Sequence, residues 1–104
     1  MKIPFFKYDI FSLQMIIDFI NDQPADTFIL IGHTDSQGIK KANLKLSKER
    51  AESMKSILIR DFGLNSEKIN TDGEGETNPI SENNSAFGRS MNRRVELRLN
   101  NGEF

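Results

Sequence analysis

Three side chains that could bind a charged ligand lie close together in the first half of this chain. A carboxylate (Asp35), an amide (Asn43) and a guanidinium (Arg50) belong to the stretch GHTDSQGIKKANLKLSKER at positions 32–50. A carboxylate accepts hydrogen bonds from an ammonium, and an arginine can meet a carboxylate with two parallel hydrogen bonds. An acid and a base held apart on a rigid frame therefore suit a zwitterion. The pattern favours a binding site over a catalytic one.

Each of these residues also has an ordinary structural interpretation. Asp35 follows an apolar run and could form a turn. Asn43 could be a local cap or turn residue, and Arg50 could be a solvated helix residue beside a surface acid. If positions 43–50 are helical, Asn43 and Arg50 lie two turns apart and on the same face. Both interpretations stay open at this point.

Catalysis and metal binding have weaker support. His33, Asp35 and Ser36 are close in the sequence, but neighbouring residues in a strand point to opposite faces. The sequence contains no nucleophile elbow. His33 and Asp35 could share a face, yet the chain has no second histidine and no cysteine to complete a transition-metal shell. We therefore expect no enzymatic activity, no metal site and no cofactor.

Length and composition indicate one domain over residues 1–104, with a core at about 5–99 and a frayed tail at 100–104. The net charge is −1, and acids offset the arginines of 93–98, so nucleic-acid binding is not expected. No apolar run approaches the roughly 20 residues that cross a bilayer. The N-terminus is a poor secretory signal, so we expect any targeting segment to lie outside this sequence.

Hydrophobic patterning predicts four strands, at 3–6, 27–31, 68–72 and 92–99, and two helices whose apolar stripes run through 13–20 and 51–62. The run at 27–31 is apolar at every position after Thr27, which is typical of an inner strand. Pro4 indicates an edge position for the first strand. Ser47 is the candidate N-cap of the second helix, and Gly63 is its stop signal.

The last third of the chain is more polar. Residues 74–90 are rich in Gly, Asn, Ser and Glu, which predicts a long working loop. The last strand alternates apolar residues, expected to face inward, with charged residues, expected to face outward: Val95, Leu97 and Leu99 against Arg94, Glu96 and Arg98. Arg93 and Arg94 point to opposite faces of a strand. At most one of them is therefore expected to reach a ligand, and the other is expected in a surface ion pair.

The element order is strand, helix, strand, helix, strand, strand. Two strand–helix–strand crossovers followed by a closing strand predict an α+β fold. We expect a two-layer α/β sandwich with a mixed four-stranded sheet and both helices on one face.

Four sequence blocks occur in order: GHTDSQG at 32–38, N-L-x-L-S-x-x-R-A at 43–51, G-x-G-E-x-x-P at 73–79 and G-R-S-M-N-R-R-V-E-L at 88–97. Together they resemble the C-terminal domain of OmpA-like proteins, a family that includes the peptidoglycan-associated lipoprotein and MotB. The resemblance covers about residues 5–99. The stretch FFKYDI is also similar to the first strand and loop of peptidoglycan-associated lipoproteins.

The resemblance implies a non-catalytic domain that binds the diaminopimelate residue of the peptidoglycan stem peptide. It also implies a place on the periplasmic face of the envelope, with a membrane tether supplied by sequence outside this chain. Asp35 would hold the ligand's ammonium and Arg50 its carboxylate. The full set of corresponding ligand-binding positions is Asp35, Arg50, Asn43, Thr34, Arg94 and Arg93.

Two departures from the family pattern concern the N-terminal wall of the site. Phe6 stands where many relatives carry an aspartate, and the segment before the second strand is short, so the first helix is expected to lose about a turn. These departures leave a second hypothesis, a protein-interaction module of the envelope with weak or lost peptidoglycan binding. The sequence specifies no oligomeric state.

Overall fold

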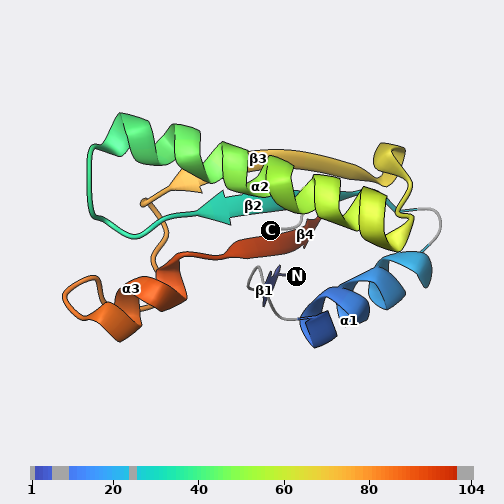
Figure 1. Ribbon diagram of the computed structural model, residues 1–104, viewed down its shortest axis with the longest axis horizontal. Coiled ribbons are helices and arrows are strands. Elements are labelled where there is room, and N and C mark those ends of the chain that lie inside the picture. Colours follow the sequence, from blue (N-terminus) through green and yellow to red (C-terminus); the bar gives the residue numbers. More distant parts are fainter. Residues whose placement is uncertain (1, 6–9, 24–25, 101–104) are drawn as a thin grey trace.

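The computed structural model describes residues 2–5, 10–23 and 26–100, with side chains from Leu13 onward. These residues form an α+β fold built on a mixed sheet (Figure 1). None of the helices described here is both long enough and apolar enough to cross a membrane. In chain order the elements are β1 (Lys2–Phe5), α1 (Ile10–Asn21), β2 (Phe28–His33), α2 (Lys40–Phe62), a 3₁₀ turn (Ser66–Lys68), β3 (Ile69–Gly75), α3 (Ala86–Asn92) and β4 (Val95–Leu99).

The sheet is organised around β2, which lies between a parallel and an antiparallel neighbour. Residues 28–32 pair in parallel with β3 and antiparallel with β4. The inner position predicted from the apolar run is therefore confirmed. At the β4 edge, β1 extends the sheet as an antiparallel strand. Pro4 fits this edge because a proline cannot donate to a further strand.

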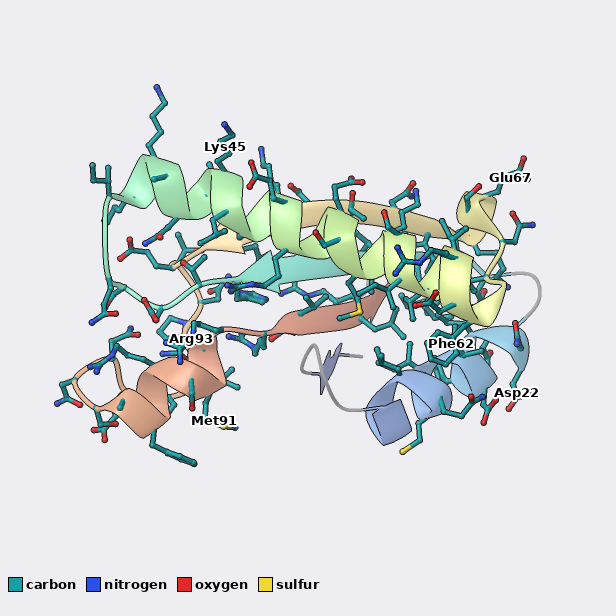
Figure 2. All side chains as sticks on the ribbon, viewed as in Figure 1. Asp22, Lys45, Phe62, Glu67, Met91 and Arg93 are labelled. Carbon is teal, nitrogen blue, oxygen red and sulfur yellow. The ribbon has the colours of Figure 1, made fainter. Side chains whose placement is uncertain are left out.

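The hydrophobic core lies between the sheet and the two longer helices. In Figure 1, α2 lies over β2 and β3, and α1 lies near the C-terminal end of α2; Phe62 marks that end in Figure 2. Each fully buried Leu, Ile or Phe stabilises the fold by about 1.5–3 kcal/mol. The buried apolar residues are Leu13, Ile16, Ile17, Ile20, Phe28, Leu30, Ala51, Met54, Leu58, Leu64, Ile69, Val95 and Leu97. The stripe predicted along the second helix is thus buried as expected.

The predicted start of that helix at Ser47 is wrong, because α2 begins at Lys40. Ser47 is buried inside the helix, where its Oγ donates to the Leu44 carbonyl at 2.7 Å and accepts from the Gly75 N–H at 2.9 Å. The first turns of α2 bury polar residues, so their hydrophobic period is too weak to indicate a helix. The end is as predicted: Gly63 has φ of 69° and its N–H donates to the Ile59 carbonyl.

The long loop expected at 74–90 is also partly wrong, because it contains the short helix α3. The Ser85 hydroxyl caps this helix by accepting from the Gly88 N–H at 3.0 Å. Asn92 closes the loop: its Oδ1 accepts from the N–H groups of Ile80 and Ser81, and its Nδ2 donates to the Ser81 carbonyl. Polar side chains that bond locally to the backbone order this segment without an apolar stripe.

A buried layer of charges covers the sheet face opposite the core. The residues expected to point outward, Arg94, Glu96 and Arg98, are 2%, 5% and 7% exposed, so the expectation that they face solvent is wrong. Glu96 pairs with Arg94 at 2.6 Å and with Arg98 at 2.7 Å, and Arg98 also pairs with Glu74 at 2.8 Å. Alternation indicates which side a residue faces, and mutual pairing decides whether a charge on that side can be buried.

Acid is expected to destabilise the fold in two pH ranges. Arg98 lowers the pKa of Glu74 from 4.5 to about 2, so the stability that this carboxylate contributes is present above pH 4.5 and lost as the pH falls toward 2. Burial and the charge of Arg94 lower the pKa of His33 below 6.5. The unfolded chain therefore binds a proton first, and stability already falls as the pH drops below 6.5. Urea unfolding at a series of pH values tests this, and an unfolding free energy that is constant from pH 7 to pH 3 would contradict it.

Candidate functional site

Asp35 and Arg50 lie at the same end of the sheet, where β2 ends. Asp35 is in the loop that follows β2, and Arg50 reaches back from α2. The Arg50 Nη1 donates to the carbonyl of His33, the last residue of β2, at 2.5 Å. The acid therefore belongs to the short segment 33–35, and the base is hydrogen-bonded to the first residue of that segment.

Two glycines allow α2 to lie close enough to the sheet for this contact. A Cβ on Gly32 would overlap the carbonyl oxygen of Ser47, and a Cβ on Gly73 would overlap the Ser47 hydroxyl and the Lys48 backbone nitrogen. Both overlaps involve the middle of α2. The helix that carries Arg50 is thus held against β2 and β3 at a separation that only glycine permits.

Asp35 is an ionised and largely buried carboxylate. It is 7% exposed; its Oδ1 accepts from the Gln37 N–H at 2.9 Å and its Oδ2 accepts from Arg93 Nη1 at 2.6 Å. Burial alone would raise the pKa of Asp35, but these two hydrogen bonds and the charge of Arg93 hold it below its usual value. The carboxylate is therefore charged at neutral pH and available to a cation.

Arg50 is a half-buried guanidinium. Among the residues that the structure describes, it forms no ion pair with a carboxylate, and its one hydrogen bond goes to the His33 carbonyl. Burial and the nearby charge of Arg93 lower the pKa of Arg50, while Asp35 opposes this shift. A guanidinium stays protonated even so. Arg50 thus presents positive charge and unused N–H donors to an anion.

Thr34 and Asn43 shape the loop that carries Asp35. Both are buried, and both donate to its backbone: Thr34 Oγ to the Asp35 carbonyl at 2.9 Å and Asn43 Nδ2 to the Gln37 carbonyl at 2.9 Å. Asn43 Nδ2 also lies 3.2 Å from Oε1 of Glu76. The two predicted site residues therefore lie beside Asp35, and they hold its loop in place.

The structure separates the two adjacent arginines. Arg93 caps the end of α3, is 44% exposed and reaches Asp35; Figure 2 shows it at the junction of α3 and β4. Arg94 is 2% exposed and pairs with Glu96 on the other side of the strand, with a further hydrogen bond to the Asn78 carbonyl. The expected surface ion pair is therefore wrong, because the pair is buried. The ligand-binding role that the resemblance implies for Arg94 stays a prediction.

Sequence reasoning missed a group of residues from the 83–92 segment. The Asn83 Oδ1 accepts from the Ser36 N–H at 3.2 Å, next to Asp35, and from Asn92 Nδ2 at 2.9 Å. The Arg89 Nη1 donates to the Asn83 carbonyl at 3.1 Å, and the charge of Arg89 helps to lower the pKa of Asp35. The block GRSMNRRVEL at 88–97 contains Arg89 and Asn92 but not Asn83, and only the folded loop brings the three together at the site.

Comparison with known proteins agrees with the four blocks. The OmpA family model matches residues 7–93. The chain belongs to the OmpA family. The family's domain is non-enzymatic.

This OmpA-family domain is 37% identical over 88 residues to outer membrane porin F of Pseudomonas aeruginosa, covering 85% of the chain and 25% of the relative. It is 45% identical over 74 residues to outer membrane protein A of Bordetella avium, covering 71% and 38%. The chain thus spans less than half the length of these relatives.

Solved structures resemble the domain as well. The periplasmic domain of Helicobacter pylori MotB has a TM-score of 0.72 at 28% identity, over 85% of this chain and 57% of that one. The cell wall anchor of the T6SS from Pseudomonas aeruginosa has a TM-score of 0.67 at 31% identity, over 84% and 62%. The peptidoglycan-associated lipoprotein from Burkholderia pseudomallei has a TM-score of 0.76 over 94% and 88%; at 21% identity it supports the fold alone.

Proposed function

We propose that this OmpA-family domain binds peptidoglycan non-covalently through the diaminopimelate residue of the stem peptide. In this proposal the domain lies on the periplasmic side of the envelope and anchors a larger protein to the wall. The observation that carries it is the half-buried Arg50, without a carboxylate partner among the described residues, beside the ionised Asp35. The likeness to a cell wall anchor at 31% identity supports the same function.

Diaminopimelate matches the site because one of its carbons carries both a free amine and a free carboxylate. The carboxylate would meet Arg50 with two parallel N–H···O bonds. The ammonium would bind Asp35, whose buried carboxylate already accepts two hydrogen bonds and has lone pairs for another. The loop is held by Thr34 and Asn43 before any ligand arrives, so little conformational entropy is lost on binding.

The same arrangement predicts discrimination between wall chemistries. A lysine-type stem peptide carries the amine but lacks the second carboxylate. Binding it would cover Arg50 without giving its charge a partner, and an unpaired charge in a desolvated interface is costly. Selectivity would then come from an unfavourable contact with the wrong peptide as well as from a good fit to the right one.

Titration calorimetry with two matched tripeptides tests this proposal. We expect the diaminopimelate peptide to bind at least about 30-fold more tightly than the lysine peptide, which corresponds to roughly 2 kcal/mol. Equal binding of the two peptides would contradict the charge-pair account. If neither peptide binds, the result would instead favour the interaction module, in which the domain contacts a partner protein of the envelope.

A further inference from the structure

Arg89 and Arg93 form a pair of like charges one turn apart at the edge of the site. The Arg93 N–H donates to the Arg89 carbonyl at 3.2 Å, so the two residues stand at helical i,i+4 spacing. Side chains at this spacing are neighbours, and like charges there repel. Asp35 is the acid that both of them affect, through an ion pair with Arg93 and through the charge of Arg89.

Both arginines keep most of their donors unused. Among the described residues, Arg89 donates only to the Asn83 carbonyl and Arg93 only to Asp35, although a guanidinium has five N–H donors. Arg93 is 44% exposed and Arg89 is half-buried, so solvent reaches the pair. In the part of the chain that is described, Arg89 forms no ion pair.

The charges around Asp35 do not balance. Three guanidiniums, from Arg50, Arg89 and Arg93, act on the single carboxylate of Asp35. A zwitterion adds no net charge. When its ammonium binds Asp35, it competes with Arg93 for the same carboxylate, and the two neighbouring arginines lose part of their counter-charge.

We propose that Arg89 and Arg93 form a second anion subsite, which binds another carboxylate of the same stem peptide. This inference rests on the proposed function and deepens it. The residue before diaminopimelate in a stem peptide is a glutamate joined through its side-chain carboxyl, which leaves its α-carboxylate free. That group is a further anion on the ligand, on the side of the peptide that leads to the sugar. Its binding lowers the net positive charge at the two arginines and fixes the direction in which the peptide runs through the site.

Two tripeptides that differ only at this group test the subsite: alanine, γ-linked glutamate and diaminopimelate, with the glutamate α-carboxyl either free or amidated. We expect the wild-type domain to bind the free acid at least about tenfold more tightly, because a charge-assisted hydrogen bond is stronger than a neutral one. Arg89→Gln is expected to bring the ratio close to one, because any change that it causes at Asp35 affects both peptides equally and cancels in the ratio.

The control is Arg60→Gln, which removes the same charge from an exposed position of α2 that pairs with Asp61; it should keep the wild-type ratio. If Arg89→Gln unfolds, Arg89→Lys retains the charge and should give an intermediate ratio. A wild-type ratio of one with the diaminopimelate contact intact would overturn the subsite and leave the proposed function standing. An unchanged ratio in a folded Arg89→Gln domain would also overturn it, and failure of both peptides to bind would remove the proposed function itself.

Discussion

Replacing Arg50 with alanine is expected to weaken binding of a diaminopimelate peptide at least about 30-fold, or roughly 2 kcal/mol. The variant leaves the ligand carboxylate without its partner in a site where water is partly excluded. Asp35→Asn should have an effect of the same size, because it removes the charge that the ammonium meets and keeps an oxygen for the Gln37 N–H. Both losses can be measured by calorimetric titration of the folded variants.

The stability of these variants separates a binding role from a structural one. Arg50→Ala removes one charged hydrogen bond to the His33 carbonyl, which should cost about 1.5–3 kcal/mol of unfolding free energy and leave the domain folded. The matched control is Arg60→Ala on the same helix, whose exposed guanidinium pairs with Asp61. Unchanged affinity in both Arg50→Ala and Asp35→Asn would rule out the proposed contacts. Unfolding of both would show that the two residues serve the fold.

The second large effect is expected at Gly32. Gly32→Ala should lower the free energy of unfolding by about 3 kcal/mol or more, at the upper end for an overpacked site. The added Cβ overlaps the carbonyl oxygen of Ser47, which is backbone in the middle of α2 and cannot rotate away. The helix must move off β2, which also moves Arg50 away from Asp35. Peptide binding should therefore fall in any fraction that stays folded.

Gly63→Ala is the matched control for this change. Gly63 has a positive φ of 69°, but a Cβ there would meet nothing within 4 Å. Its cost should be limited to the backbone strain of an alanine in the left-handed region, about 1–2 kcal/mol. Urea unfolding of the two variants gives the comparison. A Gly32→Ala domain no less stable than Gly63→Ala would show that the close helix–sheet approach is not needed.

Elements that bury apolar residues could be predicted from the sequence. The run at 27–31 predicted the inner strand β2, the stripe at Ala51, Met54 and Leu58 predicted the buried face of α2, and Gly63 predicted its end. The placement of Asp35 and Arg50 around one loop also follows the pattern, because a strand end, a short loop and a helix bring them together.

Polar residues with structural roles account for most of what could not be predicted. Ser47 has the chemistry of a cap, yet its burial inside α2 depends on its hydrogen bond with Gly75, which is distant in the sequence. Glu96 and Arg98 alternate like exposed residues, and only partners from β3 and β4 show that they are buried. The 78–92 loop is ordered by Asn92 instead of by apolar periodicity. Such contacts arise only when distant segments meet.

The placement of Arg93 and Arg94 could likewise be predicted only in part. Strand alternation placed them on opposite faces, and the structure agrees that they diverge, with Arg93 on Asp35 and Arg94 on Glu96. Which of the two lies toward Asp35 depends on where α3 ends, since Arg93 caps that helix. A helix that the sequence did not reveal thus decides which arginine reaches Asp35.

The most direct test is a crystal structure of the domain with a diaminopimelate tripeptide bound. The account predicts that the free carboxylate of the diaminopimelate forms two hydrogen bonds with Arg50, at about 2.7–2.9 Å, and that the adjacent ammonium contacts the carboxylate of Asp35. A peptide bound elsewhere on the domain, or one that leaves Arg50 bonded only to the His33 carbonyl, would contradict it.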